Sequence, residues 1–389
     1  MLSDATLQYG EQITAALLGV DRLLRVPGGE DDDRLVVVNM APGHQPSDFA
    51  GFAEAEARLH ELDAAADALP EPDRRLYYHQ LCASTLAVID QRRAPLPLAE
   101  QIERFLHVPS DPASEAELDA MRREMRALLT GMGYSGDLSA QCAAWEQRHL
   151  VRPDDVKEVL LGLLDEAWDR TAELMPLPAP KADGMGVATL RDAHFNARAD
   201  YLGRTIEINV DPVLTGPALK HLAVHEGYPG HYVQFKLREH WYAEGTAPAD
   251  GLLSVVNSAS SCTFEGIADS GLHLLVWVRT DDDRLSAILT HYHAGLATAA
   301  AWRLHALGWT ELQTADWMRG QALTGGEGWV DNRLRFIAAP QRCALITSYW
   351  QGEPNVAAAW KRVPSDRHPE FLRFVYGRMH STQSIMMFQ

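Results

Sequence analysis

The 389-residue chain lacks most features of secreted, membrane-spanning and disulfide-rich proteins. Its four cysteines are scattered without a C-x-x-C pair, which favours reduced core thiols. It has no run of about 18 apolar residues, so we expect no membrane span. Its first residues, MLSDATLQYGEQIT, show neither the basic nor the apolar region of a signal peptide. These absences predict a cytoplasmic protein.

Positive charge is also scarce. The chain has 35 Lys and Arg against 53 Asp and Glu, which gives a formal net charge of −18. This balance argues against nucleic acid and against an anionic membrane surface as partners. With 46% hydrophobic residues, the chain can bury a sizeable core in one or two domains. The sequence leaves the oligomeric state open.

Apolar residues recur mainly at helical spacing, so we expect a mainly α-helical protein. Residues 1–175 predict an N-terminal helical region, with a short strand at 35–38 and an exposed acidic loop at 31–33. Residues 176–187, rich in Pro and Gly, predict a hinge. Residues 188–389 form the predicted metal-binding catalytic region. Further helices are predicted at 47–69, 72–92, 114–130, 138–149, 153–174, 254–279 and 284–307.

Chemistry concentrates in the stretch LKHLAVHEGYPGHYVQ at 219–234. It predicts a helix that carries His225 and Glu226 and is interrupted before His231. In the H-E-x-x-H helix of zinc hydrolases, two His four residues apart share one face, and the Glu is the general base. Here the second His comes six residues after the first. On a regular helix this spacing turns it roughly 240° away, so the helix must be distorted to bind one ion.

The residues between the two histidines favour such a distortion. Pro229 has no N–H, and its ring clashes with the carbonyl of His225 in a regular helix. Gly227 and Gly230 permit backbone angles that other residues resist. A bulge or local unwinding that absorbs two residues would bring His231 back beside His225. The alternative is a proline-kinked core helix whose histidines are only hydrogen-bonded.

A catalytic zinc site needs a third protein ligand and an open position for water. Glu265 is our candidate, because it lies in the largely apolar stretch 252–278, where a carboxylate is costly to bury without a partner. Asp269, four residues later, shares its helical face. It is an alternative ligand or an acceptor that orients a ligand histidine. A salt bridge from Glu265 to an arginine such as Arg303 is the competing interpretation.

The HEGYPGH segment, the F-E-G around Glu265 and the later Tyr349-x-x-Gly352 resemble the bacterial family catalogued as domain of unknown function eight-eight-five. Its members are regarded as metallopeptidases. The family signature is HEGYPGHH, and this chain has Tyr232 in place of the last His. The resemblance covers residues 190–355. It implies a gluzincin-like helical architecture with a short edge strand or small sheet beside the active-site cleft.

Residues 205–210 (TIEINV) alternate in polarity and predict a strand just before the metal helix. In helical metallopeptidases an edge strand at this place pairs with the extended substrate, since its N–H and C=O groups are available. Asn209 is then a candidate substrate-binding residue. A wall strand without substrate contact is the alternative.

Tyr349 is the candidate donor to the oxyanion of a tetrahedral intermediate, a role that the resemblance implies for the Tyr before x-x-Gly. The segment between Pro340 and Gly352 is three residues longer than in the family. A tyrosine packed at a helix end is the competing interpretation. His380 is a second candidate donor and, with Asn209, a candidate substrate-binding residue.

The sequence thus predicts a zinc-dependent metallopeptidase that hydrolyses oligopeptides. His225, His231 and Glu265 would hold one zinc or another divalent ion per chain. Glu226 would take a proton from the attacking water and deliver it to the leaving amine. One alternative is a metal-dependent amidase that acts on a modified amino acid or a small amide. A third possibility is a catalytically degenerate helical binding or structural module.

Overall fold

The computed structural model describes residues 2–25, 34–193 and 197–389, so the predicted acidic loop at 31–33 lies outside the described residues. The chain forms two compact units, each built from separate segments. The first unit contains Met1–Ser110, Val233–Ile267 and Gln351–Gln389. The second contains Asp111–Tyr232 and Ala268–Trp350. The predicted hinge at 176–187 lies wholly within the second unit, so the units do not follow one another along the chain as the three predicted regions do.

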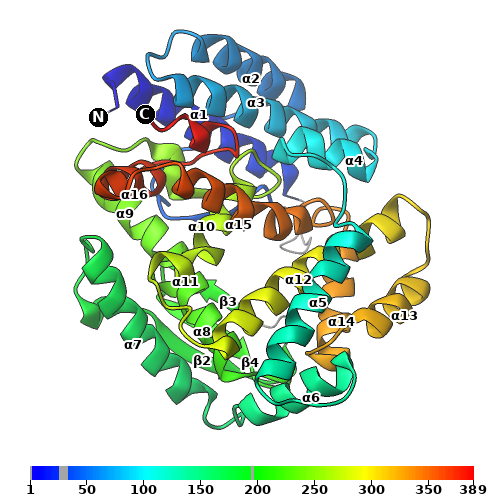
Figure 1. The fold of residues 1–389 in the computed structure, drawn as a ribbon. Helices are drawn as coiled ribbons and strands as arrows, with labels where there is room; N and C mark the ends of the chain where they lie inside the picture. The colour runs from blue at the N-terminus through cyan, green and yellow to red at the C-terminus, as the bar shows by residue number, and fades with distance from the viewer. Residues whose placement is uncertain (1, 26–33, 194–196) are drawn as a thin grey trace. The chain divides into compact units, whose positions relative to one another are not determined.

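The first unit is a helical assembly with one small sheet (Figure 1). Its first three helices, α1 (Asp4–Leu24), α2 (Phe52–Ala66) and α3 (Pro72–Arg93), pack against one another in sequence order. Short α4 (Leu98–Gln101) follows, and α16 (His368–Tyr376) lies near the chain's end. Strands β1 (Val36–Asn39) and β5 (Leu253–Val255) pair antiparallel, which joins segments far apart in the sequence.

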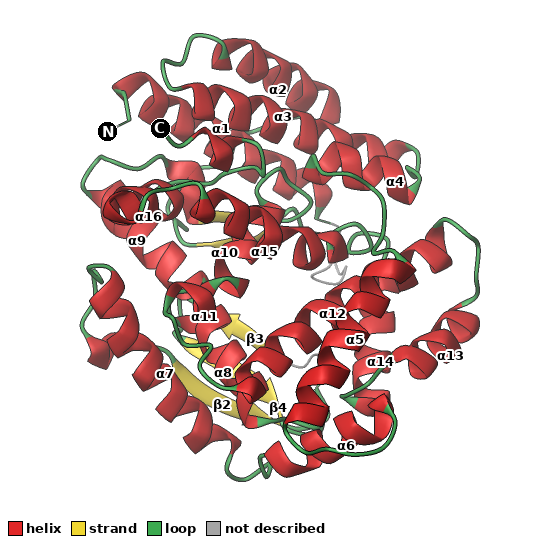
Figure 2. Cartoon of the chain, in the orientation of Figure 1, coloured by secondary structure: helices red, strands yellow, loops and turns green. Residues whose placement is uncertain are grey.

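The second unit combines helices with a three-stranded sheet (Figure 2). Strand β4 (Thr205–Asn209) lies between β2 (Gly186–Leu190), to which it is parallel, and β3 (Ala197–Asp200), to which it is antiparallel. Helix α7 (Val156–Leu174) packs against β2. The other helices of this unit are α5 (Glu115–Gly131), α6 (Leu138–His149), α8 (Gly216–Leu222), α11 (Gly271–Leu274), α12 (Asp281–His305), α13 (Glu311–Gln321) and α14 (Gly326–Ala338).

Three helices continue from one unit into the other along the chain. They are α9 (His231–Ala243), α10 (Ser261–Asp269) and α15 (Ile346–Lys361). Two of them carry predicted ligands, His231 at the start of α9 and Glu265 within α10. None of the described helices is both long and apolar enough to cross a membrane.

The prediction of a mainly α-helical fold is confirmed, and most expected helices are present. Helix α5 begins after Ser114, which forms a capping box with Glu117. The expected helix at 47–69 begins later, at Phe52, and Asp48 forms an ion pair with Arg22 instead of capping it. The expected strand at 35–38 appears as β1, shifted by one residue.

Two expectations are wrong. The single helix at 254–279 is instead β5, a serine-rich turn, α10 and α11. In that turn the hydroxyl of Ser258 donates to the carbonyl of Val255 and the hydroxyl of Ser261 accepts from the Ser258 N–H, so side chains replace helical hydrogen bonds. The strand at 205–210 exists as β4, but it is the central strand of its sheet and not an edge.

Candidate metal centre

The chain closes the six-residue spacing by distorting the helix, as the sequence predicts. After α8, residues Ala223–Gly227 form one turn of π-helix. The N–H of Tyr228 donates to the carbonyl of Ala223 at 3.2 Å, and the N–H of Gly230 donates to Val224 at 3.0 Å. These bonds reach five and six residues back instead of four, so the turn absorbs two residues. The rings of His225 and His231 then lie edge to face, with centroids 4.6 Å apart.

Gly230 is required at this break. A Cβ at that position would lie 1.8 Å from the carbonyl oxygen of His225, which is far inside van der Waals contact. Gly227 faces a similar limit, because its Cβ would lie 2.6 Å from a methyl group of Leu164 on α7. The peptide bond between Tyr228 and Pro229 is cis. The glycines that the sequence marks as permissive therefore allow close approach of the backbone to its surroundings.

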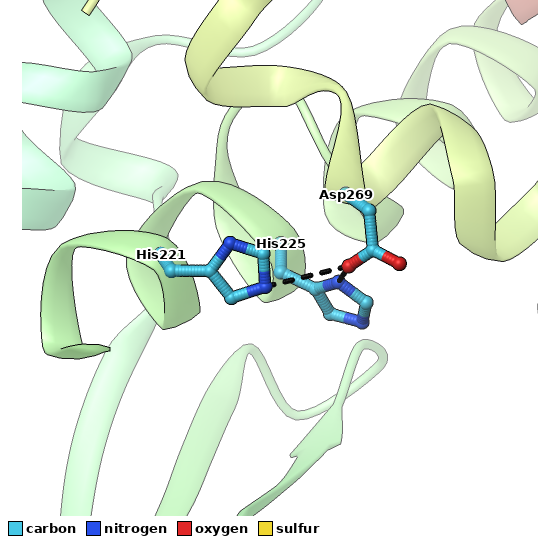
Figure 3. Close-up of side chains that lie close together, drawn as sticks. All are labelled: His221, His225 and Asp269. Atoms are coloured by element: carbon cyan, nitrogen blue, oxygen red, sulfur yellow. Dashed lines mark hydrogen bonds and ion pairs between the residues drawn. The ribbon is translucent and has the colours of Figure 1, made fainter. Parts of the chain in front are cut away.

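A carboxylate fixes the orientation of His225. The Nδ1–H of His225 donates to Asp269 Oδ1 at 2.8 Å, and His221 Nε2 approaches the same oxygen at 3.4 Å (Figure 3). Burial alone would raise the pKa of Asp269, but the charge of His225 and the hydrogen bonds from both rings lower it well below its ordinary value. The carboxylate therefore stays ionised. Because Nδ1 carries the proton, Nε2 of His225 is the atom that can coordinate a metal.

Glu265 completes a convergent donor set. One ligand atom each from His225, His231 and Glu265 lie within 4.8 Å of one another. Ligand atoms in a tetrahedral zinc site, with bonds of ~2.1 Å, are about 3.4 Å apart, so closing on an ion needs only small side-chain movements. His231 is buried at 4% exposure, while the other two side chains are partly accessible. The donor chemistry and spacing fit a divalent cation.

Gln234 ties together the two helices that carry His231 and Glu265. Its side-chain amide, on α9, donates to the carbonyl of Phe264 on α10 at 3.0 Å. Gln234 is fully buried, and its amide oxygen accepts from Arg238 at 3.1 Å. The bond from Gln234 to Phe264 lies one turn after His231 on α9 and one residue before Glu265 on α10. It therefore fixes the register of the two helices that carry these candidate ligands. No local sequence pattern singled out this residue.

The F-E-G and Tyr-x-x-Gly motifs meet through their glycines. A Cβ on Gly266 would lie 2.3 Å from the backbone of Gly352, and one on Gly352 would lie 2.3 Å from the carbonyl of Cys262. Helices α10 and α15 thus cross in backbone contact next to Glu265. Tyr349 precedes Gly352 by one turn on α15, and its ring lies edge-on to Phe336 at 6.4 Å. Its role as oxyanion donor stays a prediction.

Glu226 has a partner that the sequence did not reveal. The hydroxyl of Tyr201, in the turn after β3, donates to Glu226 Oε2 at 2.6 Å. The same ring lies edge-on to His231, with centroids 6.2 Å apart. Tyr201 therefore contacts both the predicted base and a predicted ligand. It precedes Glu226 by 25 residues, and no local pattern links the two.

Asn209 and Tyr232 make hydrogen bonds within the fold. Asn209 is buried, and its amide donates to the carbonyl of Ala193 while its oxygen accepts from the N–H of Asp211. Tyr232 donates to the carbonyl of Asp183 at 2.9 Å. Asn209 thus stabilises its own loop instead of presenting its side chain to a substrate.

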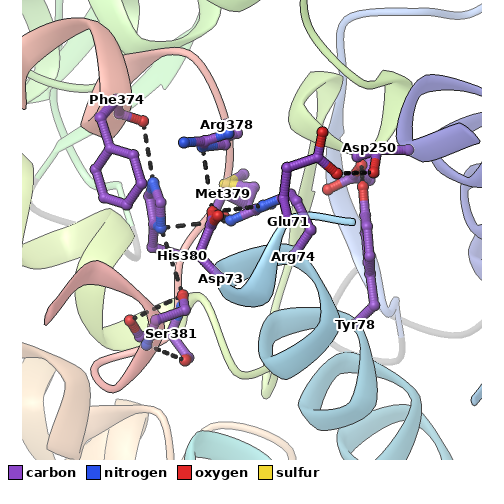
Figure 4. Close-up of polar contacts among 12 residues, drawn as sticks. Glu71, Asp73, Arg74, Tyr78, Asp250, Phe374, Arg378, Met379, His380 and Ser381 are labelled. Atoms are coloured by element: carbon purple, nitrogen blue, oxygen red, sulfur yellow. Dashed lines mark hydrogen bonds and ion pairs between the residues drawn. The ribbon is translucent and has the colours of Figure 1, made fainter. Parts of the chain in front are cut away.

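His380 lies in a buried polar network of the first unit (Figure 4). Its Nε2–H donates to the carbonyl of Phe374 at 3.0 Å, and its Nδ1 faces Arg74 at 3.4 Å. Burial, reinforced by Arg74 and Arg378, lowers the pKa of His380 well below its ordinary value. These contacts give His380 a structural role in place of the predicted role in substrate binding.

Comparison with known proteins shows the fold but no function. No family model matches the chain, and no curated protein matches it. A solved structure described as "the putative lipoprotein from Colwellia psychrerythraea" aligns with a TM-score of 0.58 and 15% identity over 87% of this chain. The chain spans 63% of that protein's length. A second, "a putative lipoprotein of unknown function from Shewanella oneidensis", gives a TM-score of 0.54 and 13% identity, covering 97% of this chain and 72% of its own.

Proposed function

We propose that the protein is a zinc-dependent hydrolase that cleaves peptide bonds in oligopeptides. The convergence of His225, His231 and Glu265 within 4.8 Å carries the proposal. Two imidazoles and one carboxylate are the protein ligands of catalytic zinc sites that keep one position open. The resemblance of the HEGYPGH segment to metallopeptidases supports the same assignment, and a gluzincin-like architecture belongs to this proposal.

The residues around the ligands support a catalytic site over a purely structural one. Asp269 holds His225 with Nε2 directed as the coordinating atom, as carboxylates do for ligand histidines in zinc enzymes. Glu226 follows His225 directly in the chain and is fixed by Tyr201. A structural zinc site needs no such base, since all its positions are filled by ligands.

Each residue then has a defined task. A bound zinc ion would lower the pKa of a water molecule and polarise the scissile carbonyl. Tyr201 donates to Oε2 of Glu226, and no hydrogen bond to Oε1 is formed by a described residue. Oε1 is therefore our candidate for the atom that would take a proton from water and pass it to the leaving amine. Tyr349 is the candidate hydroxyl donor to the oxyanion, since the hydroxyl of Tyr201 already donates to Glu226.

Metal content and turnover test this proposal together. We expect purified protein to carry about one zinc per chain by mass spectrometry, and His231→Ala to lose it. His380→Ala is the matched control, a buried histidine whose loss should leave the metal in place. Glu226→Gln should keep the metal and lower turnover of a mixed peptide library by about 10²- to 10⁴-fold.

Two outcomes would overturn parts of the proposal. Protein that stays metal-free after incubation with zinc and with manganese would refute the metal site and favour a binding module. A metal-loaded protein that hydrolyses small amides but no peptide would replace the peptidase by an amidase.

A further inference from the structure

The first unit contains a cavity of about 350 Å³ whose lining includes none of the residues of the proposed hydrolytic site. It lies among the start of α3, the end of α9, α16 and the C-terminal segment. Its volume is within the range of small-molecule sites, roughly 300–1,000 Å³. Three aromatic rings line it, those of Trp241, Phe374 and Phe388. The wall can therefore pack against an apolar group.

Two of the three carboxylates that line the cavity are already engaged. Glu71 accepts from the N–H of Ser3 at 2.6 Å through one oxygen and from the hydroxyl of Thr6 through the other. These hydrogen bonds outweigh the effect of burial and lower the pKa of Glu71. Glu370 accepts two hydrogen bonds from Arg367. Neither side chain is therefore poised to bind a cationic ligand.

The third carboxylate, Asp73, is buried and pairs with two arginines (Figure 4). It accepts from Arg74 Nε at 2.9 Å, and Arg378 Nε lies 3.3 Å from the same oxygen. Arg74 is fully buried, and one of its terminal nitrogens has no hydrogen-bond partner among the described residues. A single carboxylate thus faces two guanidinium groups at the inner wall.

The arginines of the lining, in contrast, keep donors available. The guanidinium of Arg373 contacts the face of Trp241 at 4.8 Å and makes no hydrogen bond or ion pair with any described residue. Arg378 is 17% exposed and lies over Phe374 at 4.5 Å. Its Nε faces Asp73, while its terminal nitrogens make no hydrogen bond or ion pair with any described residue. Burial and the nearby charge of Arg74 lower the pKa of Arg378 to about 10, which indicates that Asp73 compensates its charge incompletely.

We propose that this cavity binds a small monocarboxylate that carries an aromatic or other apolar group. The carboxylate would face Arg378 and Arg373, since planar guanidinium groups match carboxylates through paired hydrogen bonds. The apolar group would pack against Trp241 and Phe374. A phosphate dianion fits less well, because Glu71, Asp73 and Glu370 line the same space and would repel a second negative charge.

Isothermal titration calorimetry of the full chain with phenylacetate, phenylacetamide and phenyl phosphate tests the site. We expect phenylacetate to bind at least about tenfold more tightly than the neutral amide and more tightly than the phosphate, given the strength of charge-assisted bonds. Arg378→Met should weaken phenylacetate binding about tenfold or more, and Arg373→Met severalfold. Arg319→Met, on α13, removes an exposed arginine elsewhere and should have no effect.

Different results of the titrations would overturn different parts of the proposal. Equal binding of acid and amide, or tighter binding of the phosphate, would overturn the proposed ligand class. No binding of phenylacetate up to about 10 mM, weaker than any useful site, would overturn the site itself, as would unchanged affinity in both methionine variants. If Arg378→Met does not melt cooperatively, Arg373→Met decides the question, because Arg373 is exposed and its loss does not disturb the core.

Discussion

Asp250 in the first unit is buried and Asp269 in the second is 10% exposed at its side chain, and both lie in polar clusters. Their surroundings nevertheless shift their pKa values in opposite directions. Burial raises the pKa of Asp250, and the arginines near it only partly offset this effect. Two histidine rings hydrogen-bond to Asp269 and lower its pKa. The contacting groups, and not burial alone, therefore decide whether such a carboxylate stays charged.

The two clusters also differ in what supplies the positive charge. Around Asp250 the chain itself supplies it, through the fully buried Arg74 and Arg238, while Tyr78 donates to the carboxylate at 2.8 Å. Around Asp269 the contacting groups are imidazoles, which can be neutral and can bind a metal. A carboxylate surrounded by arginines can only stabilise the fold. A carboxylate that contacts histidines can also orient an imidazole that binds a metal ion in place of a proton.

Removing the carboxylate of Asp250 should lower the stability of the fold more than any other change considered. Asp250→Ala removes the acceptor of the Tyr78 hydroxyl. It also removes a negative charge near the fully buried Arg74 and Arg238 and leaves Asp73 as the carboxylate paired with Arg74. We therefore expect the free energy of unfolding to fall by about 3–5 kcal/mol. Urea denaturation measures this, and metal content should not change. Asp316→Ala removes an exposed carboxylate paired with Arg319 and should cost less than about 0.5 kcal/mol. If Asp250→Ala lowers the free energy of unfolding as little as Asp316→Ala does, the polar cluster around Asp250 does not stabilise the fold.

A side chain at the backbone break should separate the two histidines. The Cβ in Gly230→Ala collides with the carbonyl of His225, so His231 must move away. We expect a loss of zinc affinity greater than the roughly 10- to 100-fold that an outer contact costs. Gly162→Ala on α7 is the control, because its Cβ meets no atom within 4 Å. Retained affinity in Gly230→Ala would mean that the break does not set the spacing.

The matched change in the second cluster should affect the metal and not the fold. Asp269→Asn keeps an oxygen that can accept from His225 Nδ1 but removes the charge that polarises the ring. We expect zinc affinity to fall about 10- to 100-fold, measured by competition with a chelating dye. Asp165→Asn, an exposed change on α7, is the control. If Asp269→Asn lowers the free energy of unfolding as much as Asp250→Ala does, the distinction between the clusters is wrong.

The convergence of His225, His231 and Glu265 was predictable because its signals in the sequence are local. The glycines and proline between His225 and His231 indicated a distortion, and the isolated Glu265 in an apolar stretch indicated a third ligand. The order of strands in the sheet was not predictable, since the alternation of residues 205–210 is the same in a central strand as in an edge strand. The break in the helix expected at 254–279 depends on serine hydroxyls that compete with the backbone, which apolar periodicity does not register.

The residues that the sequence missed reach the site through tertiary contacts. His221 precedes His225 by four residues on one helical face, a spacing that could have singled it out. Its acceptor, Asp269, follows His225 by 44 residues. Tyr201 lies in a turn whose position depends on the pairing of β3 with β4. Only the folded chain brings these groups together.

Tyr201 gives the smallest and most specific of these predictions. Tyr201→Phe removes one hydroxyl, and with it the hydrogen bond that holds Oε2 of Glu226. We expect kcat on a peptide substrate to fall about tenfold, or about 1.4 kcal/mol in activation free energy, with zinc affinity unchanged. Tyr228→Phe is the matched control, because its hydroxyl accepts from the N–H of Met185 and not from the site. An unchanged kcat in zinc-loaded Tyr201→Phe would show that Glu226 is positioned by the π-helical turn alone.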